Sequence, residues 1–594
     1  MRSAIGATIA LLLLGLVPAQ AAAAQQRVVL AWVPSGTTVA EMAAAGLAPG
    51  VMSAGLGKVP AEQTRLDVGQ GNRVFDSLYD EPLPARAGDG SRWWREVVER
   101  AESAPAEIVP GLLRKTLAEA GDRPRFSERR GASLARLTPP RGGELLIAIA
   151  RPTGRSDEPL PIAIGGGGFD GNLTSDSTRT DGYVLSTDVA PTILRQFGIP
   201  VPSEMSGQPI RSQGAVDPAA VESLVARMDV ISSRRGPVIG LNVVVWLLGL
   251  LLLAALSRGR LARPAVRVVG LSVVYLPLVL LLGAALEPGE TAEQVLVLLL
   301  CPLLAAGTLV LVRGYRALAT ASALTVLAYA IDAIAGSPLT SLSLLGPNPG
   351  LGVRFYGIGN ELEALLAVLV VAGTGAGLTG FGPELPRRRT AVAFLAIGLL
   401  AAFVFAAGRF GADVGAAIVF PVGAVVAAVV AAGRGRRLGL LAVVAVPLAV
   451  LALLALIDLA SGANAHLTRS VLDAGGLGSL GDVAQRRLQL SAHSFGRPVL
   501  LALLPLVVAA AVLAYLRRDR LGAWLGGVPA MRAGLIGTLA ATVIGTLAND
   551  SGALLLEIGT AYLLVFTAFA WAETDGKSGE TSRQTKRYTS VTQI

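Results

Sequence analysis

The sequence predicts an α/β domain followed by an all-α membrane bundle of about eleven helices. Of the 594 residues, 52% are hydrophobic and only 16% are charged, whereas soluble proteins carry about 25% charged residues. Short strand-like apolar runs occur before residue 235, and much longer apolar runs follow it. The expected parts are a signal peptide (1–24), an extracytoplasmic α/β domain (25–235), a multi-span membrane domain (236–572) and a disordered cytoplasmic tail (573–594).

The composition also restricts the expected partners and cofactors. Despite a net charge of +9, the arginines form short clusters between apolar runs and no basic face, which indicates membrane topology and not nucleic-acid binding. A single cysteine, Cys301, excludes an intramolecular disulfide, and two histidines are too few for a histidine-rich metal cluster. We therefore expect the lipid bilayer as a partner, and neither nucleic acid, metal nor cofactor.

Residues 1–24 have the pattern of a cleavable signal peptide. Arg2 precedes an apolar stretch from Ile5 to Val17, and the small-residue run AQAAAA follows. An uncleaved anchor helix is the alternative, although this apolar stretch is short for a span. In either case the next segment is exported, which places it outside the plasma membrane of a bacterial-type cell.

The exported segment has strand and helix patterns in alternation. RVVLAWV (27–33), ELLIAIA (144–150) and PLPIAIGGGG (159–168) are short continuous apolar runs, as expected for buried strands. Residues 91–121 have helical spacing of apolar positions. Strands that alternate with helices predict an α/β sheet with both faces covered.

A stretch in this domain, about Glu144 to Ile210, resembles the alkaline phosphatase superfamily. The resemblance is carried by the superfamily's terminal signature, whose positions are occupied here by Thr187, Asp188, Ala190, Pro191, Thr192, Ile193 and Gly198. It implies an α/β sandwich and, in active members, two metal ions that Asp and His side chains hold around a Ser or Thr nucleophile.

The residues that this two-metal chemistry needs are missing from the expected places. Pro-Ser-Gly (34–36) follows the first strand, where the family has Asp-Gly, and Arg-Pro-Thr-Gly (151–154) follows ELLIAIA, where Asp and His are usual. Thr64 is the nearest candidate nucleophile, but no metal would activate it. Asp188 fits a surviving site residue or, more simply, a helix N-cap. We therefore expect a pseudoenzyme domain.

The membrane domain is predicted from eleven apolar runs and the charges between them. The runs lie at about 237–256, 268–286, 295–312, 317–335, 361–381, 391–408, 414–433, 438–458, 498–516, 533–549 and 552–571. With the first domain outside, the arginine clusters fall on inner loops, and the outer connector 287–294 contains no Lys or Arg. This pattern satisfies the positive-inside rule and places the C-terminus in the cytoplasm.

Polar residues at the membrane boundary predict a binding site. RFYGIGNELE (354–363) and GRFGADVG (408–415) each combine glycine, arginine and carboxylate, a combination that suits irregular backbone lining a polar cavity. Charges at helix ends, such as Asp332, can instead simply mark the interface. The predicted substrate-binding residues are Arg354, Tyr356, Asn360, Glu361, Glu363, Arg409, Asp413, Asp550 and Glu557.

Three functions are compatible with these patterns. The first is a cell-envelope protein that binds or translocates an anionic, lipid-linked or glycan-like substrate from the outer face, with the outer domain recognising its headgroup or an envelope protein. The second is an outward-facing glycosyl or polymer transferase, similar in plan to O-antigen polymerases and ligases, with His466 or His493 of the connector 459–497 as acid or base. The third is a metal-dependent phosphatase or sulfatase.

Overall fold

The computed structural model describes residues 27–73, 83, 90–103, 107–121, 124–134, 137, 143–433, 436–460, 488–496 and 498–589. The predicted signal peptide and most of the connector 459–497 lie outside these residues. The chain divides into two compact units. Unit 1 comprises the residues up to Ala226 together with Gly350–Val353, and unit 2 comprises Arg227–Pro349 and the residues from Arg354 onwards.

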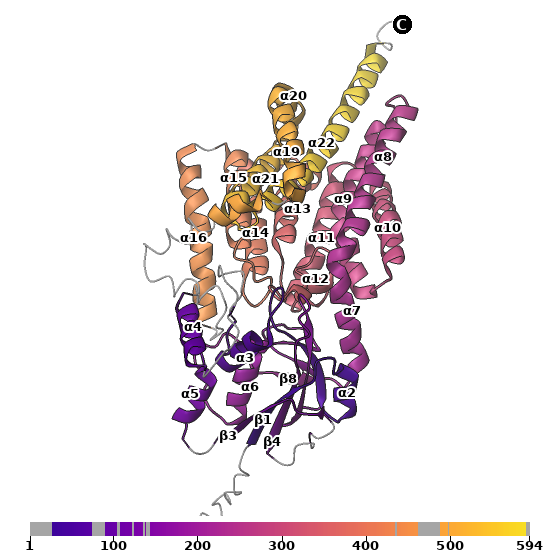
Figure 1. The fold of residues 1–594 in the computed structure, drawn as a ribbon. Helices are drawn as coiled ribbons and strands as arrows, with labels where there is room; N and C mark the ends of the chain where they lie inside the picture. Colours follow the sequence, from indigo (N-terminus) through magenta and orange to yellow (C-terminus); the bar gives the residue numbers. More distant parts are fainter. Residues whose placement is uncertain are drawn as a thin grey trace, which may run out of the picture. The chain divides into compact units, whose positions relative to one another are not determined.

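Unit 1 is built on a mixed sheet of six strands (Figure 1). The strands of the chain are β1 (Arg27–Val33), β2 (Ala48–Ser53), β3 (Arg125–Arg130), β4 (Glu144–Ala150), β5 (Pro159–Gly166), β6 (Asn172–Thr174), β7 (Tyr183–Leu185) and β8 (Arg211–Gln213). The order in the large sheet is β3-β1-β4-β5-β2-β7, while β6 and β8 form a separate pair. β1 is parallel to β3 and β4, whereas β5 is antiparallel to β4 and β2. The three predicted strand runs coincide with β1, β4 and β5.

Helices cover both faces of this sheet. Its helices are α2 (Val39–Ala44), α3 (Ala61–Gln70), α4 (Ser91–Glu102), α5 (Leu112–Glu119), α6 (Val189–Gln196) and the first part of α7 (Pro218–Arg234). Side chains alternate between the faces of a strand, so Leu30 and Trp32 of β1 pack with α3, α5 and α6, while Ala31 and Val33 pack with Met42 of α2. The layers are those of an α/β sandwich, whereas the kinship with alkaline phosphatases stays a prediction.

A short segment from far along the chain also belongs to unit 1. The guanidinium of Arg73 donates from Nη1 to the carbonyl of Gly352 at 2.8 Å. Gly352 has a φ of +73°, and a Cβ there would lie 2.6 Å from the carbonyl oxygen of Gly55. Only glycine tolerates both the left-handed backbone and this close approach without strain.

Unit 2 is a bundle of helices. Their bounds are α8 (Leu241–Leu256), α9 (Ala262–Leu286), α10 (Glu290–Leu311), α11 (Tyr315–Ile334), α12 (Pro338–Leu342), α13 (Asn360–Phe381), α14 (Arg387–Ala406), α15 (Ala416–Ala432), α16 (Arg436–Ala460), α19 (Pro498–Leu516), α20 (Arg518–Gly526), α21 (Pro529–Ala548) and α22 (Gly552–Thr589). Among the described residues, 8 helices are long and apolar enough to cross a membrane. Three further predicted runs correspond to the shorter apolar helices Ala416–Ala432, Leu441–Ile457 and Leu503–Leu516. These helices fit a multi-pass membrane protein.

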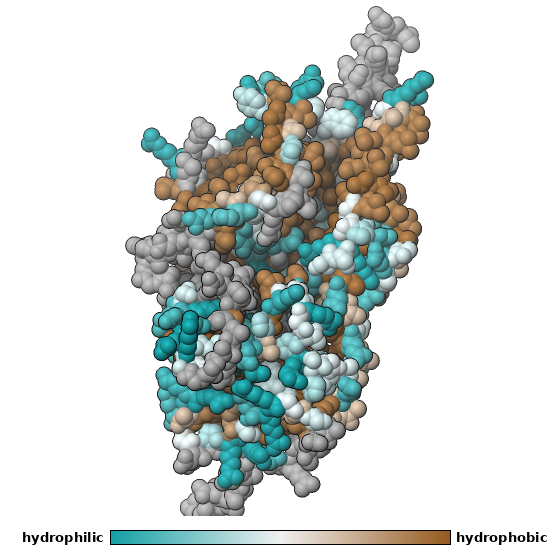
Figure 2. Space-filling model, in the orientation of Figure 1, coloured by the Kyte–Doolittle hydropathy of each residue, from teal (hydrophilic) through white to brown (hydrophobic). Residues whose placement is uncertain are grey.

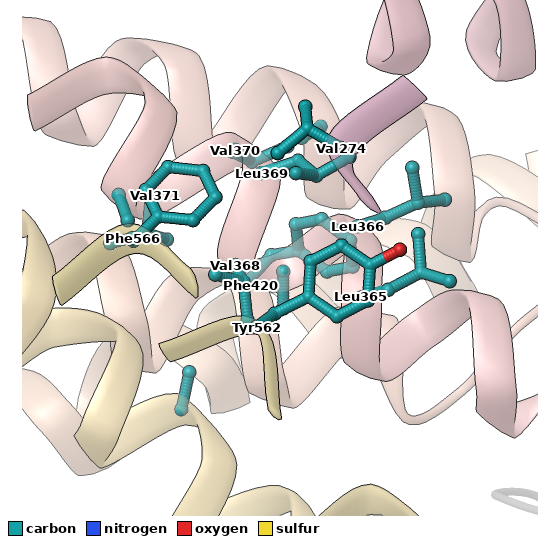
Figure 3. Close-up of a cluster of buried hydrophobic side chains, with 14 of the residues drawn as sticks. Val274, Leu365, Leu366, Val368, Leu369, Val370, Val371, Phe420, Tyr562 and Phe566 are labelled. Atoms are coloured by element: carbon teal, nitrogen blue, oxygen red, sulfur yellow. The ribbon is translucent and has the colours of Figure 1, made fainter. Parts of the chain in front are cut away.

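α13 lies in the core of unit 2, and 67% of an 18-residue apolar stretch of this helix is buried. In Figure 3, Leu366 and Val371 of α13 lie in one cluster with Phe420 of α15 and with Tyr562 and Phe566 of α22. By contrast, only 17% of the corresponding apolar stretch is buried in the continuous helix Pro218–Leu256, which contains α8. Figure 2 shows hydrophobic residues gathered over the helices of unit 2, the surface expected of helices in contact with lipid.

The helix that contains the last predicted span continues into the C-terminal segment, and the disorder of this tail stays a prediction. α22 continues as helix to Thr589, well beyond the expected end of the span at 572. The segment after Glu573 is polar, so the apolar run ends there, but it contains no proline that would break the helix. The side of the membrane on which this end lies stays a prediction.

Candidate functional site

Two irregular segments of unit 2 meet at the N-terminal end of α13. The first, residues 354–359, directly precedes α13, and the second, residues 407–415, connects α14 to α15. The N–H of Ile358 donates to the carbonyl of Gly411 at 3.0 Å. Gly357 has a φ of +78°, and any side chain there would collide with the same carbonyl. Glycine at 357 therefore allows the two segments to pair directly.

Glu363 lies in the first turn of α13 and is fully buried. Its Oε2 accepts a 2.7 Å hydrogen bond from Nδ2 of Asn549, which follows α21. Its Oε1 has no hydrogen-bond partner among the described residues. A Cβ built on Gly415 would lie 2.6 Å from Oε1, so the carboxylate packs against the backbone that leads into α15. Because buried polar atoms are almost always hydrogen-bonded, Glu363 is an unusual, incompletely satisfied acceptor.

Asp413 is the second buried carboxylate of this region, with 2% of its surface exposed. Its Oδ1 accepts the N–H of Gly415 at 3.0 Å, and Nη1 of Arg354 lies 3.7 Å from its Oδ2. Arg354 also donates to the carbonyl of Ile358. Asp413 and Arg354 both act electrostatically on Glu363. Arg354 therefore acts on both buried carboxylates of this region.

Amide side chains connect this region to the end of α21. Nδ2 of Asn360 donates to Oδ1 of the exposed Asp550 at 3.1 Å, and Nδ2 of Asn549 lies 3.3 Å from Oδ1 of Asn360. Asn549 thus contacts both Asn360 and Glu363. We call the whole group the Glu363 cluster, which consists of Arg354, Asn360, Glu363, Asp413, Asn549 and Asp550.

The other predicted binding residues of unit 2 are Tyr356, Glu361, Arg409 and Glu557. Oε1 of Glu361 is 3.3 Å from Nη1 of Arg235. Tyr356 is half-buried and Arg409 is exposed, each within one of the two irregular segments. Glu557 is half-buried on α22 and makes no hydrogen bond or ion pair to any residue that the structure describes.

Of the weaker catalytic candidates, His493 and Thr64 lie among the described residues. His493 is exposed, and its Nδ1 lies 2.8 Å from the carbonyl of Gln489, one turn earlier in the chain. His466 lies outside the described residues. Thr64 is buried in α3, where its hydroxyl donates to the carbonyl of Pro60 at 3.2 Å.

Asp332 has a structural role. Its two oxygens accept the N–H groups of Leu339 at 3.1 Å and of Thr340 at 2.8 Å, which caps the short helix α12. Free N–H groups at the start of a helix are commonly satisfied in this way. Asp332 is therefore a buried capping residue, and its position relative to the membrane boundary stays a prediction.

Asp188 of unit 1 is a buried anchor of the fold. It accepts hydrogen bonds from the hydroxyls of Ser175 (2.6 Å) and Ser177 (2.5 Å) and from the N–H groups of Leu185 and Gln208 (both 2.9 Å). Burial raises its pKa, and these four donors partly offset the shift. Its side chain caps the turn before α6 and makes no cap to α6 itself. The predicted N-cap is therefore displaced by one turn.

Comparison with known proteins identifies no relative of this chain. Searches against protein-family models, curated proteins and solved structures find no match. Within the described residues, no group of three or more His, Cys, Asp or Glu side chains is placed to hold a metal ion. The Glu363 cluster is therefore the candidate site of unit 2.

Proposed function

We propose that this chain is an integral membrane protein of the cell envelope that binds an anionic or lipid-linked substrate at the Glu363 cluster and moves it within the bilayer. Unit 1 would be a non-catalytic domain that recognises the polar headgroup of the substrate. The observation that carries the proposal is the burial of Glu363, with one oxygen unpaired, where irregular backbone enters the apolar bundle.

The cost of the cluster supports a functional role. An ionisable side chain costs about 2.5–3.5 kcal/mol at the centre of a membrane helix by insertion scales, and ionisable residues within membrane segments are mostly functional. A single ion pair between Arg354 and Asp413 would be enough to join the two irregular segments. Glu363 adds a second buried carboxylate without a paired cation of its own, which packing alone does not require.

The exposed arginines support the substrate class. The side chain of Arg354 is 35% exposed at the cluster, and Arg409 is exposed in the segment that also contains Asp413. Guanidinium groups bind phosphate and carboxylate oxygens in bidentate geometry. Helices with exposed apolar side chains, such as α8 with Leu251 64% exposed, would keep the substrate's lipid chain in the bilayer.

Reconstitution of the full chain in liposomes tests this function. Transbilayer movement would be followed with a fluorescent phosphatidylglycerol and a fluorescent polyprenyl phosphate, using an impermeant reductant that bleaches only the outer leaflet. A fluorescent phosphatidylcholine is the neutral comparison. We expect the protein to accelerate movement of at least one anionic lipid, and Glu363→Gln to slow it about tenfold, the effect of losing about 1.4 kcal/mol.

Glu290→Gln is the matched control variant. Glu290 also lies in the first turn of an apolar helix, α10, but it is exposed. We expect its variant to move lipid at the rate of the unmodified chain. Equal rates for vesicles with and without protein, or equal rates for the two variants, would contradict the proposed function.

A further inference from the structure

The junction of α11 and α12 in unit 2 gathers buried oxygen atoms around one carboxylate. Asp332 lies in the last turn of α11 and is 6% exposed. Its Oδ1 and Oδ2 accept hydrogen bonds from the N–H groups of Leu339 and Thr340, at 3.1 and 2.8 Å. Ser337 is the N-cap residue of α12, and its N–H donates to the carbonyl of Asp332 at 2.8 Å. The carboxylate of Asp332 therefore lies at the start of α12, together with Ser337 and Thr340.

Two hydroxyl groups at this junction have no hydrogen-bond partner among the described residues. An N-cap serine normally accepts the N–H of the second or third residue of its helix, but here Asp332 binds both of these N–H groups. Oγ of Ser337 is left unpaired, although the residue is 0% exposed. Oγ1 of Thr340, a residue 1% exposed, is unpaired as well. Because buried polar atoms are almost always bonded to protein, water or an ion, these two oxygens indicate a ligand.

The negative charge of Asp332 is also not neutralised by the protein. Within the described part of the chain, its carboxylate bonds only the two N–H groups of α12, which carry no net charge, and the last turn of α11 contains no basic residue. Arg227 contacts the far end of α12 through the carbonyl of Leu342, but both of its terminal nitrogens bind Glu293. The C-terminal end of a helix favours a cation and disfavours a carboxylate. A buried carboxylate at this end of α11 therefore calls for a positive ligand.

We propose that Asp332, Ser337 and Thr340 bind one Na⁺ ion at the junction of α11 and α12. Small hard cations take oxygen ligands, and the carboxylate and the two unpaired hydroxyls provide them. In membrane proteins, Na⁺ is held where helices are interrupted, close to the C-terminal end of a helix segment. The site shares no residue with the Glu363 cluster and does not rest on the proposed function.

The charge of the site favours Na⁺ over water and over a divalent ion. Water would satisfy the two hydroxyls but would leave the carboxylate of Asp332 without a counter-charge. Ca²⁺ takes about six to eight oxygen ligands, commonly from several carboxylates. In the part of the chain that the structure describes, no three acidic, imidazole or thiol groups converge. One carboxylate is balanced by one monovalent ion, which would hold the start of α12 against the end of α11.

Hydrogen exchange of the full chain in lipid nanodiscs tests the inference. The amides to follow are those of residues 337–345, because the N–H groups of Leu339 and Thr340 bind the carboxylate. NaCl would be compared with choline chloride at constant ionic strength. At ten times the Kd of Na⁺, we expect exchange in this segment to slow about tenfold, along a saturable curve with one Kd.

Two variants identify the ligands without removing any hydrogen bond. Ser337→Ala and Thr340→Val each delete an unpaired hydroxyl, so in choline chloride both should exchange like the unmodified chain. Both should raise the Kd of Na⁺ about tenfold or more, since loss of even an outer-shell partner weakens metal binding about 10–100-fold. Thr538→Val is the matched control, because Thr538 of α21 is also 0% exposed with an unpaired hydroxyl. We expect this variant to keep the unmodified Kd.

Two results would overturn the inference. Exchange at residues 337–345 that does not respond to Na⁺ in the unmodified chain would show that water alone serves the two hydroxyls. A response to Na⁺ with the same Kd in Ser337→Ala, Thr340→Val and Thr538→Val would place the ion elsewhere. Because lipid movement is not measured, neither result bears on the proposed function of the Glu363 cluster.

Discussion

Replacing Glu293 with glutamine should destabilise unit 2 strongly, because Glu293 neutralises two arginines in the interior. Arg227 donates to it with both terminal nitrogens, at 3.0 and 3.3 Å, and Nη1 of Arg234 donates at 3.0 Å. The side chain of Glu293 is 0% exposed, that of Arg227 3% and that of Arg234 15%. Glutamine keeps the shape but removes the charge, which leaves two guanidinium groups without a counterion.

The magnitude follows from the burial of the three groups. Breaking a buried ion pair by removing one partner costs about 3–5 kcal/mol, whereas a change on an exposed surface costs within about 0.5 kcal/mol. Arg227 and Arg234 keep their bonds to the carbonyls of Leu342 and Pro288, at 3.1 and 2.8 Å. These remaining bonds hold the guanidinium groups in place, so they cannot easily turn towards solvent.

The assay is denaturant unfolding of the full chain in micelles, followed by circular dichroism. Glu290 is the matched control, since it is an exposed glutamate one turn earlier in the same helix, α10. We expect Glu293→Gln to lose about 3–5 kcal/mol and Glu290→Gln to lose less than about 0.5 kcal/mol. If the two variants were equally stable, the buried triad would not hold this part of unit 2 together, and the reasoning would be wrong.

Three further predictions concern unit 1, each measured on the full chain. Asp188→Asn should cost about 1–3 kcal/mol in urea unfolding, because an amide N–H would face the N–H of Leu185. Gly352→Ala should increase hydrogen exchange at residues 350–353, because its Cβ would lie 2.6 Å from the carbonyl oxygen of Gly55; unchanged exchange would refute this packing. Burial raises the pKa of Tyr183 to about 12, against about 10 when unfolded. The phenol therefore contributes stability that is complete below pH 10 and lost as pH rises through 12, about 3 kcal/mol in all, and Tyr183→Phe should remove this dependence.

Three strands could be predicted because their own residues already indicate that they are buried. β1, β4 and β5 are continuous apolar runs, so burial on both faces is visible in the residues themselves. β2 has the sequence APGVMS and is fully buried between β5 and β7. Its proline and glycine argue against a central strand, so only tertiary pairing identifies it.

The direction of β5 has a similar explanation. A sheet of alternating strands and helices is expected to be parallel, yet β4 and β5 are antiparallel. The connection between them, residues 151–158, is too short for the crossover that a parallel neighbour needs. The antiparallel direction of β5 relative to β4 could therefore have been derived from the length of this connection.

In the candidate site, the pattern of glycine, arginine and carboxylate located both irregular segments. Residues 361 and 363 of α13 face different directions, because successive side chains of a helix are about 100° apart. Glu363 contacts Asn549, while Glu361 turns to Arg235. Asn549 was not predicted as a site residue, because an amide at the end of an apolar run resembles an ordinary boundary residue. Whether the cluster binds a substrate stays a prediction.

The rate of anionic lipid movement in Gly415→Ala, compared with Gly307→Ala, tests whether the position of the Glu363 carboxylate governs this movement. Gly415→Ala keeps every polar group of the Glu363 cluster, yet its methyl group would lie 2.6 Å from Oε1 of Glu363 and displace the carboxylate. At Gly307 of α10, a Cβ meets nothing within 4 Å. We expect Gly415→Ala to be slowed about as strongly as Glu363→Gln, about tenfold, and Gly307→Ala to move lipid at the unmodified rate. Equal rates in the two alanine variants would show that the position of Glu363 is not what the function depends on.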